Sequence, residues 1–178
     1  MKKIVLVFLL AAGFGFCANA QKFAHINSQE LVSLMSEMDS ARVKLNAYQA
    51  DLEETFQGMQ DEYNTKLNDY QRKNSTWSPS IRETKEQELQ ELVNRIQQFQ
   101  QSAPQDLQQM QQTLLAPVYD KADAAIKKVA KENGYIYVFD LSAGAINYVD
   151  EAQSINILDL LKAELGIPAE KVSPTVIE

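Results

Sequence analysis

Cysteine and histidine are almost absent from this chain of 178 residues, which contains one of each. A disulfide needs two cysteines and a structural zinc site needs a cluster of such ligands, so the chain can form neither within itself. The nucleotide-binding pattern G-x-x-x-x-G-K-[ST] is also missing, and the carboxylates are spread along the sequence without convergence. We therefore predict no catalytic residue, no metal, no nucleotide and no cofactor, and expect that the protein is not an enzyme.

Long apolar runs are equally scarce, and the one present spans residues 4–16. Two lysines precede it and an A-x-A motif ending at Ala20 follows, which is the pattern of a signal peptide. The run is shorter than the roughly 20 apolar residues that a membrane-spanning helix needs. We expect cleavage after Ala20, removal of residues 1–20 together with Cys17, and export to the periplasm. Lipidation of Cys17 is disfavoured by the bulky Phe16 beside it.

Basic residues are outnumbered by acidic ones, and the net charge is −7. Loss of Lys2 and Lys3 with the signal peptide leaves 15 basic against 24 acidic side chains, a net charge of −9. Nucleic acids attract basic surfaces, so no nucleic-acid partner is expected.

What the chain does have is glutamine and a regular apolar pattern. Fifteen glutamines lie between Gln49 and Gln112, which is typical of a solvated helix surface. Two apolar stripes share spacings of three and four that repeat every eleven residues, a period of about 3.67 per turn that favours a nearly straight helix pair. The stripes are Leu45, Tyr48, Leu52, Phe56, Met59, Tyr63, Leu67 and Tyr70, and then Leu92, Ile96, Phe99, Ala103, Leu107, Met110, Leu114 and Val118.

Local signals place these stripes on an antiparallel helical hairpin over residues 28–133, with its tip at residues 77–80. Asn27 followed by Glu30 is a helix start, Ser80 with Glu83 forms a capping box for the return helix, and Gly134 is a good terminator. With no strong breaker before Trp77, the first leg is predicted as one helix, roughly 70 Å long.

The remaining residues, 22–27 and 134–168, predict a small β body with a C-terminal helix, which makes the fold class α+β. Strands are expected at residues 22–27, 135–139 and 145–149, and a helix that carries apolar positions from 155 to 165. Residues 169–178 show no periodicity and are predicted to be a flexible tail. A body of about sixty residues is marginal as a single core, so we expect several copies to share one.

Segments in both the hairpin and the body resemble the Skp/OmpH family of periplasmic chaperones. The segments are residues 83–90 (ETKEQELQ), 97–101 (QQFQQ), 105–109 (QDLQQ), 114–121 (LLAPVYDK) and 127–135 (KKVAKENGY), with residues 23–27 and 138–140. The resemblance covers about residues 22–165. It implies a jellyfish-shaped homotrimer whose helical tentacles enclose a cavity, where unfolded outer-membrane β-barrel proteins are held without ATP.

Two departures limit what the resemblance implies. Well-known members are basic whereas this chain is acidic, so a lipopolysaccharide contact is not supported. Pro104 stands where a polar helix former is expected, and it is interpreted either as a hinge or as a tolerated kink. Pro117 has a counterpart in the family, and a fixed bend at the root of the tentacle is the interpretation there.

Side chains that could hold a client come from the apolar stripes and the tip. The candidate client-binding residues are Phe56, Met59, Tyr63, Tyr70, Trp77, Phe99 and Met110. The alternative is that the stripe residues close the two legs against each other, although a two-helix hairpin cannot bury such stripes completely. For Trp77, contact with a client or membrane stands against simple capping of the tip. For His25, inside a predicted strand, a structural role is favoured.

The sequence leaves three classes of function to compare. The first is a holding chaperone for unfolded outer-membrane proteins, and the second is a rigid trimeric spacer or envelope interaction protein. The third, an enzyme, lacks the nucleophile and ligand clusters that it would need. The glutamine-rich faces and the tip tryptophan favour adaptable binding, and hence the chaperone.

Overall fold

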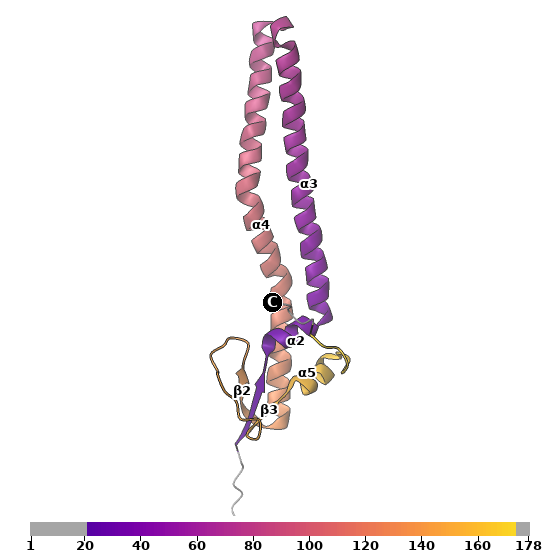
Figure 1. Cartoon of the computed structure of the whole chain (residues 1–178), viewed down its shortest axis with the longest axis vertical. Coiled ribbons are helices and arrows are strands. Elements are labelled where there is room, and N and C mark those ends of the chain that lie inside the picture. The colour runs from indigo at the N-terminus through magenta and orange to yellow at the C-terminus, as the bar shows by residue number, and fades with distance from the viewer. Residues whose placement is uncertain (1–20, 174–178) are drawn as a thin grey trace, which may run out of the picture.

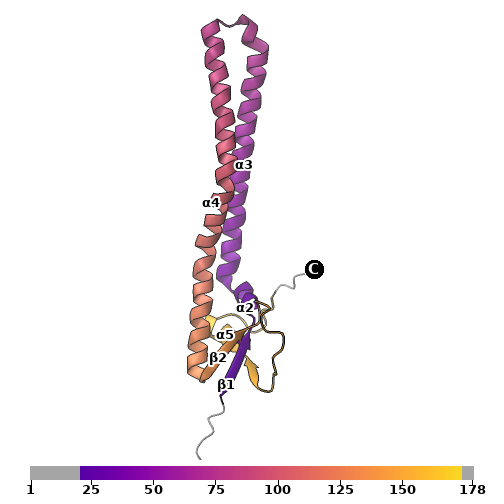
Figure 2. The ribbon, with the colours of Figure 1, turned by 90° about the vertical axis from the view of Figure 1, so that its left-hand side faces the viewer.

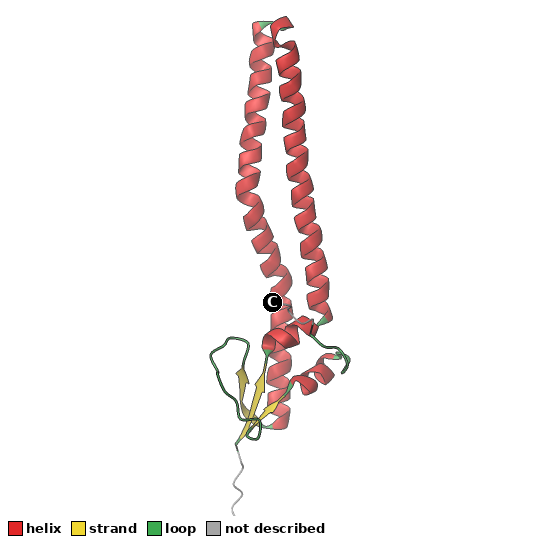
Figure 3. Cartoon of the chain, in the orientation of Figure 1, coloured by secondary structure: helices red, strands yellow, loops and turns green. Residues whose placement is uncertain are grey.

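A long helical hairpin rises from a small body in the computed structural model, which describes residues 21–173 (Figure 1). The hairpin consists of α3 (Ser36–Lys73), a 3-10 turn (Asn74–Thr76) and α4 (Pro79–Asn133). The body contains β1 (Lys22–Ile26), α2 (Ser28–Leu34), β2 (Tyr135–Asp140), β3 (Ser154–Asn156), α5 (Leu158–Leu165) and the lower part of α4. This division between one sheet and long helices is plain in Figure 3, and it confirms the predicted α+β fold class. The predicted signal peptide, residues 1–20, lies outside the described residues.

The sheet has three parallel strands in the order β2-β1-β3. β1 is the central strand and pairs with β2, and the whole hairpin serves as the crossover between them. This pairing was not predicted, since residues 145–149 were expected to be the partner of residues 135–139. The predicted strand at residues 145–149 is wrong: residues 145–150 have no regular structure, and the third strand is β3. Ser154 of β3 is buried and its Oγ lies 2.9 Å from Nδ1 of His25 in β1, a contact that a local apolar pattern cannot reveal.

The core lies between one face of this sheet and the helices. Figures 1 and 2 both place α2, α5 and the strands around the lower end of α4. The buried side chains come from β1, α2, α4, α5 and the residues beside them, whereas Tyr135 and Val138 of β2 are partly buried against this core. They are Ala24, Ile26, Leu31, Val32, Met35, Met38, Val118, Ala122, Ala125, Val129, Ile157 and Leu161.

The first leg of the hairpin is broken at Met35, which corrects the prediction of one continuous helix. Met35 has extended backbone angles of φ −73° and ψ 137° between α2 and α3. The residues around it explain the break: Leu31, Val32, Leu34, Met35 and Met38 are all buried. A straight helix against one neighbour buries a single stripe, so burying this nearly continuous set requires a change of direction.

The helix boundaries follow local capping chemistry, with one correction at the tip. Asn27 caps α2 as predicted, and its Oδ1 accepts a hydrogen bond from the N–H of Glu30 at 3.1 Å. α4 begins at Pro79 and is capped by Ser78, so the predicted capping box from Ser80 is wrong. Proline at the first helical position loses no hydrogen bond and has the φ that a helix needs, which favours the earlier start. α4 ends at Gly134, with a left-handed φ of 71°, as predicted.

The C-terminal helix is shorter than predicted. Ile155 lies in β3, and α5 starts only at Leu158. The backbone N–H of Leu158 donates a hydrogen bond of 2.9 Å to the side-chain oxygen of Asn156. Of the tail predicted as flexible, residues 169–173 contact α2, α3 and α5 through hydrogen bonds and an ion pair. Residues 174–178 are outside the described part of the chain.

Candidate functional site

The hairpin exposes a long apolar seam that is only half buried. All sixteen residues of the two stripes lie at intermediate burial except Leu92 and Val118, which are buried. Each helix has one neighbour along most of the hairpin, so one flank of each of the other fourteen stripe side chains is left open to solvent. Phe56 and Phe99 stack across the seam with ring centroids 6.3 Å apart. The structure therefore combines the two interpretations of the stripes, because the same side chains join the legs and remain accessible.

Two open grooves run along this seam. One, of about 430 Å³, has an apolar floor and a polar rim. Its lining residues are Gln49, Leu52, Glu53, Phe56, Phe99, Gln100, Ala103, Pro104 and Leu107. A second groove of about 460 Å³, nearer the tip, includes Tyr63 and Ile96. The candidates Phe56, Phe99 and Pro104 thus share one groove, and Tyr63 lines the other.

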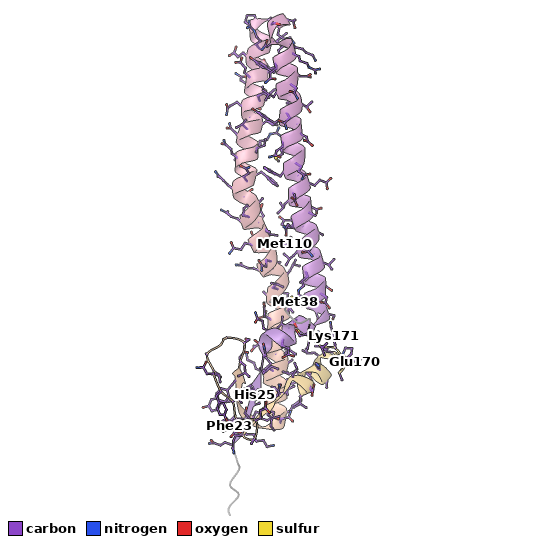
Figure 4. The ribbon with its side chains drawn as sticks, in the orientation of Figure 1. Phe23, His25, Met38, Met110, Glu170 and Lys171 are labelled. Carbon is purple, nitrogen blue, oxygen red and sulfur yellow. The ribbon has the colours of Figure 1, made fainter. Side chains whose placement is uncertain are left out.

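The remaining candidates lie apart from these grooves. Met59 and Met110 are half buried within the stripes, and Figure 4 shows Met110 about midway between the body and the centre of the hairpin. At the tip, Trp77 packs edge-on against Tyr70, with ring centroids 6.0 Å apart. The hydroxyl of Tyr70 donates to the carboxylate of Glu86, and this hydrogen bond raises the pKa of Tyr70. Trp77 therefore caps the hairpin while staying only half buried.

Both prolines lie inside α4, which continues through them. Pro104 and Pro117 are exposed, so the carbonyls that lose a helical partner can be solvated. In Figure 1, α4 curves along its length whereas α3 runs almost straight. The choice between hinge and tolerated kink at Pro104 stays a prediction, as does the bend at Pro117.

The polar flanks of the seam carry ion pairs between the legs. Lys66 lies 3.2 Å from Glu88 and Arg95 lies 3.7 Å from Glu62. Hydrogen bonds from Lys85 and Lys66 lower the pKa of Glu88. These pairs are solvent-exposed, where such contacts contribute about 0–1 kcal/mol each, so they set the register of the legs more than their stability.

Sequence reasoning missed a second apolar surface, on the outer face of the sheet. Phe23, Tyr137 and Phe139 form a continuous stack, with ring centroids between 6.1 and 6.4 Å apart. Tyr137 is 61% exposed. A groove of about 370 Å³ beside the stack is completed by the loop after β2, including Ile146 and Val149. The alternation of side chains along the two strands could have revealed this surface. Ala24 and Val138 face the helices, whereas the neighbouring Phe23 and Tyr137 face outward.

His25 has the structural role that was favoured for it. Its ring is 6% exposed and contacts Ser154, as described above, so it joins the two strands. Within residues 21–173 there is no group of three His, Cys, Asp or Glu side chains that could bind a metal. No helix in the same range is long and apolar enough to cross a membrane.

A comparison with protein families is decisive for identity. The model of the family described as outer membrane protein (OmpH-like) matches residues 22–165, most of the chain. The chain belongs to the OmpH-like family.

A solved structure shows the same fold. It is the crystal structure of an OmpH-like protein from Caulobacter crescentus CB15, named as a candidate outer membrane chaperone. The two chains share 16% sequence identity, and the match covers 89% of this chain and 94% of the other with a TM-score of 0.69. At that identity the likeness shows the OmpH-like fold alone. A comparison with curated proteins gives no match.

Proposed function

We propose that this OmpH-like protein is an ATP-independent holding chaperone of the periplasm, which binds unfolded outer-membrane β-barrel proteins between helical tentacles and prevents their aggregation. The observation that carries the proposal is the half-buried seam of the hairpin, with its grooves beside Phe99 and Tyr63. An apolar surface of this length, rimmed by polar side chains, is typical of an interaction site.

The mechanism rests on many weak contacts. An unfolded barrel strand presents alternating apolar side chains, and the seam offers aromatic rings and the adaptable methionines Met59 and Met110. The glutamines at the groove rim, such as Gln49 and Gln100, can donate to or accept from the exposed backbone of such a strand. Because no single contact is strong, the client leaves when a membrane or an assembly machine offers it a better environment.

Self-association as a homotrimer is part of the proposal. The aromatic stack of Phe23, Tyr137 and Phe139 supports it, because a water-soluble monomer gains nothing from such a face. Packing these faces together would enlarge the small body core and orient three hairpins around one cavity. No contact with lipopolysaccharide is proposed for this acidic chain.

The test is light scattering while a urea-unfolded outer-membrane β-barrel protein is diluted into buffer that contains residues 21–178, at about three chains per client. Suppressed scattering without ATP is the expected result. Phe99→Ala is expected to weaken the suppression because it empties the groove floor. Leu92→Ala, at a buried position, is the matched control and is expected to retain suppression at temperatures where it stays folded.

Unchanged scattering with several clients would reject the chaperone. A structural trimeric spacer or envelope interaction protein would then be the better interpretation of the hairpin. Equal loss of suppression in Phe99→Ala and Leu92→Ala would show that general packing, and not the groove, matters for holding.

A further inference from the structure

Both legs of the hairpin have a weak point where they meet the body. The first leg is interrupted at Met35, and the second contains Pro117, which has no N–H to bond the preceding turn. The ion pair between Glu37 and Lys121 lies between these two places along the hairpin axis, because Glu37 follows Met35 by two residues on the leg that leaves the body and Lys121 follows Pro117 by about one turn on the leg that returns to it. A hairpin with both legs weakened within about two turns of each other, next to the body, can move there as a unit.

The chain that follows α5 crosses this level. Gly166 turns the backbone with a left-handed φ of 67°, and Ile167 packs against the body core. The ammonium of Lys162, which is 7% exposed, donates to the carbonyl of Ala169 at 3.1 Å. A buried ammonium requires an acceptor, so this hydrogen bond anchors the base of the segment to α5.

Beyond this base, the segment bridges the break at Met35. Lys171 Nζ lies 3.0 Å from Oδ2 of Asp39, in the first turn of α3. The hydroxyls of Ser173 and Ser33 lie 2.7 Å apart, and Ser33 belongs to α2. One contact is therefore made on each side of the break, and Figure 4 shows Glu170 and Lys171 beside the start of α3.

We propose that residues 166–173, the root strap, restrain the joint at Met35 and limit the swing of the hairpin relative to the body. Its base is fixed by the buried Lys162 and the partly buried Ile167, whereas its far end is held by an exposed ion pair and one hydroxyl contact. The strap is therefore a releasable restraint and not a lock. It lies beyond residue 165, where the OmpH-like family match ends.

One consequence rests on the proposed function. If hairpins enclose a client, the swing at their roots sets how wide the cavity opens, and the strap favours one width. The restraint itself involves no client, and it can be tested without one.

The experiment measures spin-label distances in residues 21–178, a range that contains no native cysteine. One label pair, at Asn46 of α3 and Glu132 of α4, spans the joint, and a second pair, at Glu132 and Asp159, lies within the body. All three positions are exposed. Labelled chains are diluted with unlabelled ones so that an assembly carries at most one labelled chain. Lys171→Ala with Ser173→Ala removes both far contacts of the strap.

The expected result is that the double variant broadens the Asn46–Glu132 distance distribution about twofold and leaves the body pair unchanged, because only the joint is released. Lys128→Ala is the matched control, since it removes an ion pair with Glu164 that stays inside the body, and it is expected to change neither distribution. The charge-exchanged pair Asp39→Lys with Lys171→Glu is expected to keep the narrow distribution. An unchanged width in the double variant would overturn the proposal, and so would broadening of both label pairs, which would mean that the segment only packs the body.

Discussion

Single residues in this protein carry very different energetic weight depending on where they lie. Leu92 is the only residue between Arg42 and Pro117 that is fully buried, at 1% exposure, whereas its stripe neighbours are half open. In the body, Asp140 at the end of β2 accepts hydrogen bonds from Ser28 Oγ at 2.6 Å and from the N–H groups of Ser28 and Ser142 at 3.1 and 2.9 Å. These two positions yield contrasting predictions.

Leu92→Ala is expected to lower the free energy of unfolding by about 2–4 kcal/mol, because it removes a fully buried side chain and leaves a cavity. Leu107→Ala, in the same helix at a half-buried stripe position, is the control and is expected to cost about 1 kcal/mol, since water already reaches part of the side chain. Urea unfolding followed by circular dichroism measures both. Equal decreases in the free energy of unfolding of the two variants would show that the difference in burial between Leu92 and Leu107 does not matter for stability.

Asp140 makes the stability of the body depend on pH. Burial raises the pKa of its carboxyl, but the hydrogen bonds from Ser28 and Ser142 outweigh this, and the pKa lies below its ordinary value of 3.8. The stabilisation is therefore complete well above pH 3.8 and is lost as the pH falls through that value toward the lowered pKa of the folded state. Asp140→Asn is expected to cost about 1 kcal/mol at neutral pH and to flatten this part of the pH profile. If the free energy of unfolding of Asp140→Asn falls with acid as steeply as that of the unsubstituted protein, other carboxyls cause the pH dependence.

Among the elements, the two legs of the hairpin differ in how they tolerate interruption. The first leg breaks where five apolar residues in eight must be buried, and Gly58, which lies in the open middle of α3, does not break it. The second leg runs through Pro104 and Pro117 without ending. Burial therefore decides where a helix ends more strongly than the intrinsic preference of a single residue.

Pro104→Ala is expected to stabilise the hairpin by about 1–3 kcal/mol, because it restores a backbone hydrogen bond and the helix around it is solvated. If Pro104 is a hinge, spin-label distances between hairpin tips also become narrower in this variant. Equally broad distances would leave Pro104 as a tolerated kink. Ala103→Gly, at the neighbouring position, is the opposite control and is expected to destabilise by about 1 kcal/mol.

At the scale of the whole molecule, the two apolar surfaces lie at different places and are expected to serve different partners. The hairpin seam is narrow, long and rimmed by glutamine, which suits a variable chain. The sheet face is a compact stack of three rings on a rigid strand pair, which suits one fixed partner. This division supports assembly through the body and client binding along the hairpins.

Tyr137→Glu is expected to weaken self-association about tenfold or more, because it places a charge where the proposed interface would exclude water. Val43→Glu adds the same charge at an exposed apolar residue of α3, 69% exposed and remote from the sheet, and is expected to leave assembly intact. Sedimentation over a range of concentrations measures both. If the two variants self-associate equally strongly, the aromatic stack is not part of the interface.

The hairpin, its two apolar stripes and most helix ends were determined by the sequence alone, because helical periodicity and capping act between residues close together in the chain. The pairing of β1 with β2 was not predicted, and the third strand was expected at residues 145–149 and not at β3, where Ser154 contacts His25, 129 residues away. The break at Met35, the aromatic sheet face and the root strap were decided by the tertiary structure. Each arises from burial against segments distant in sequence, and a local pattern carries no record of which distant segment will cover it.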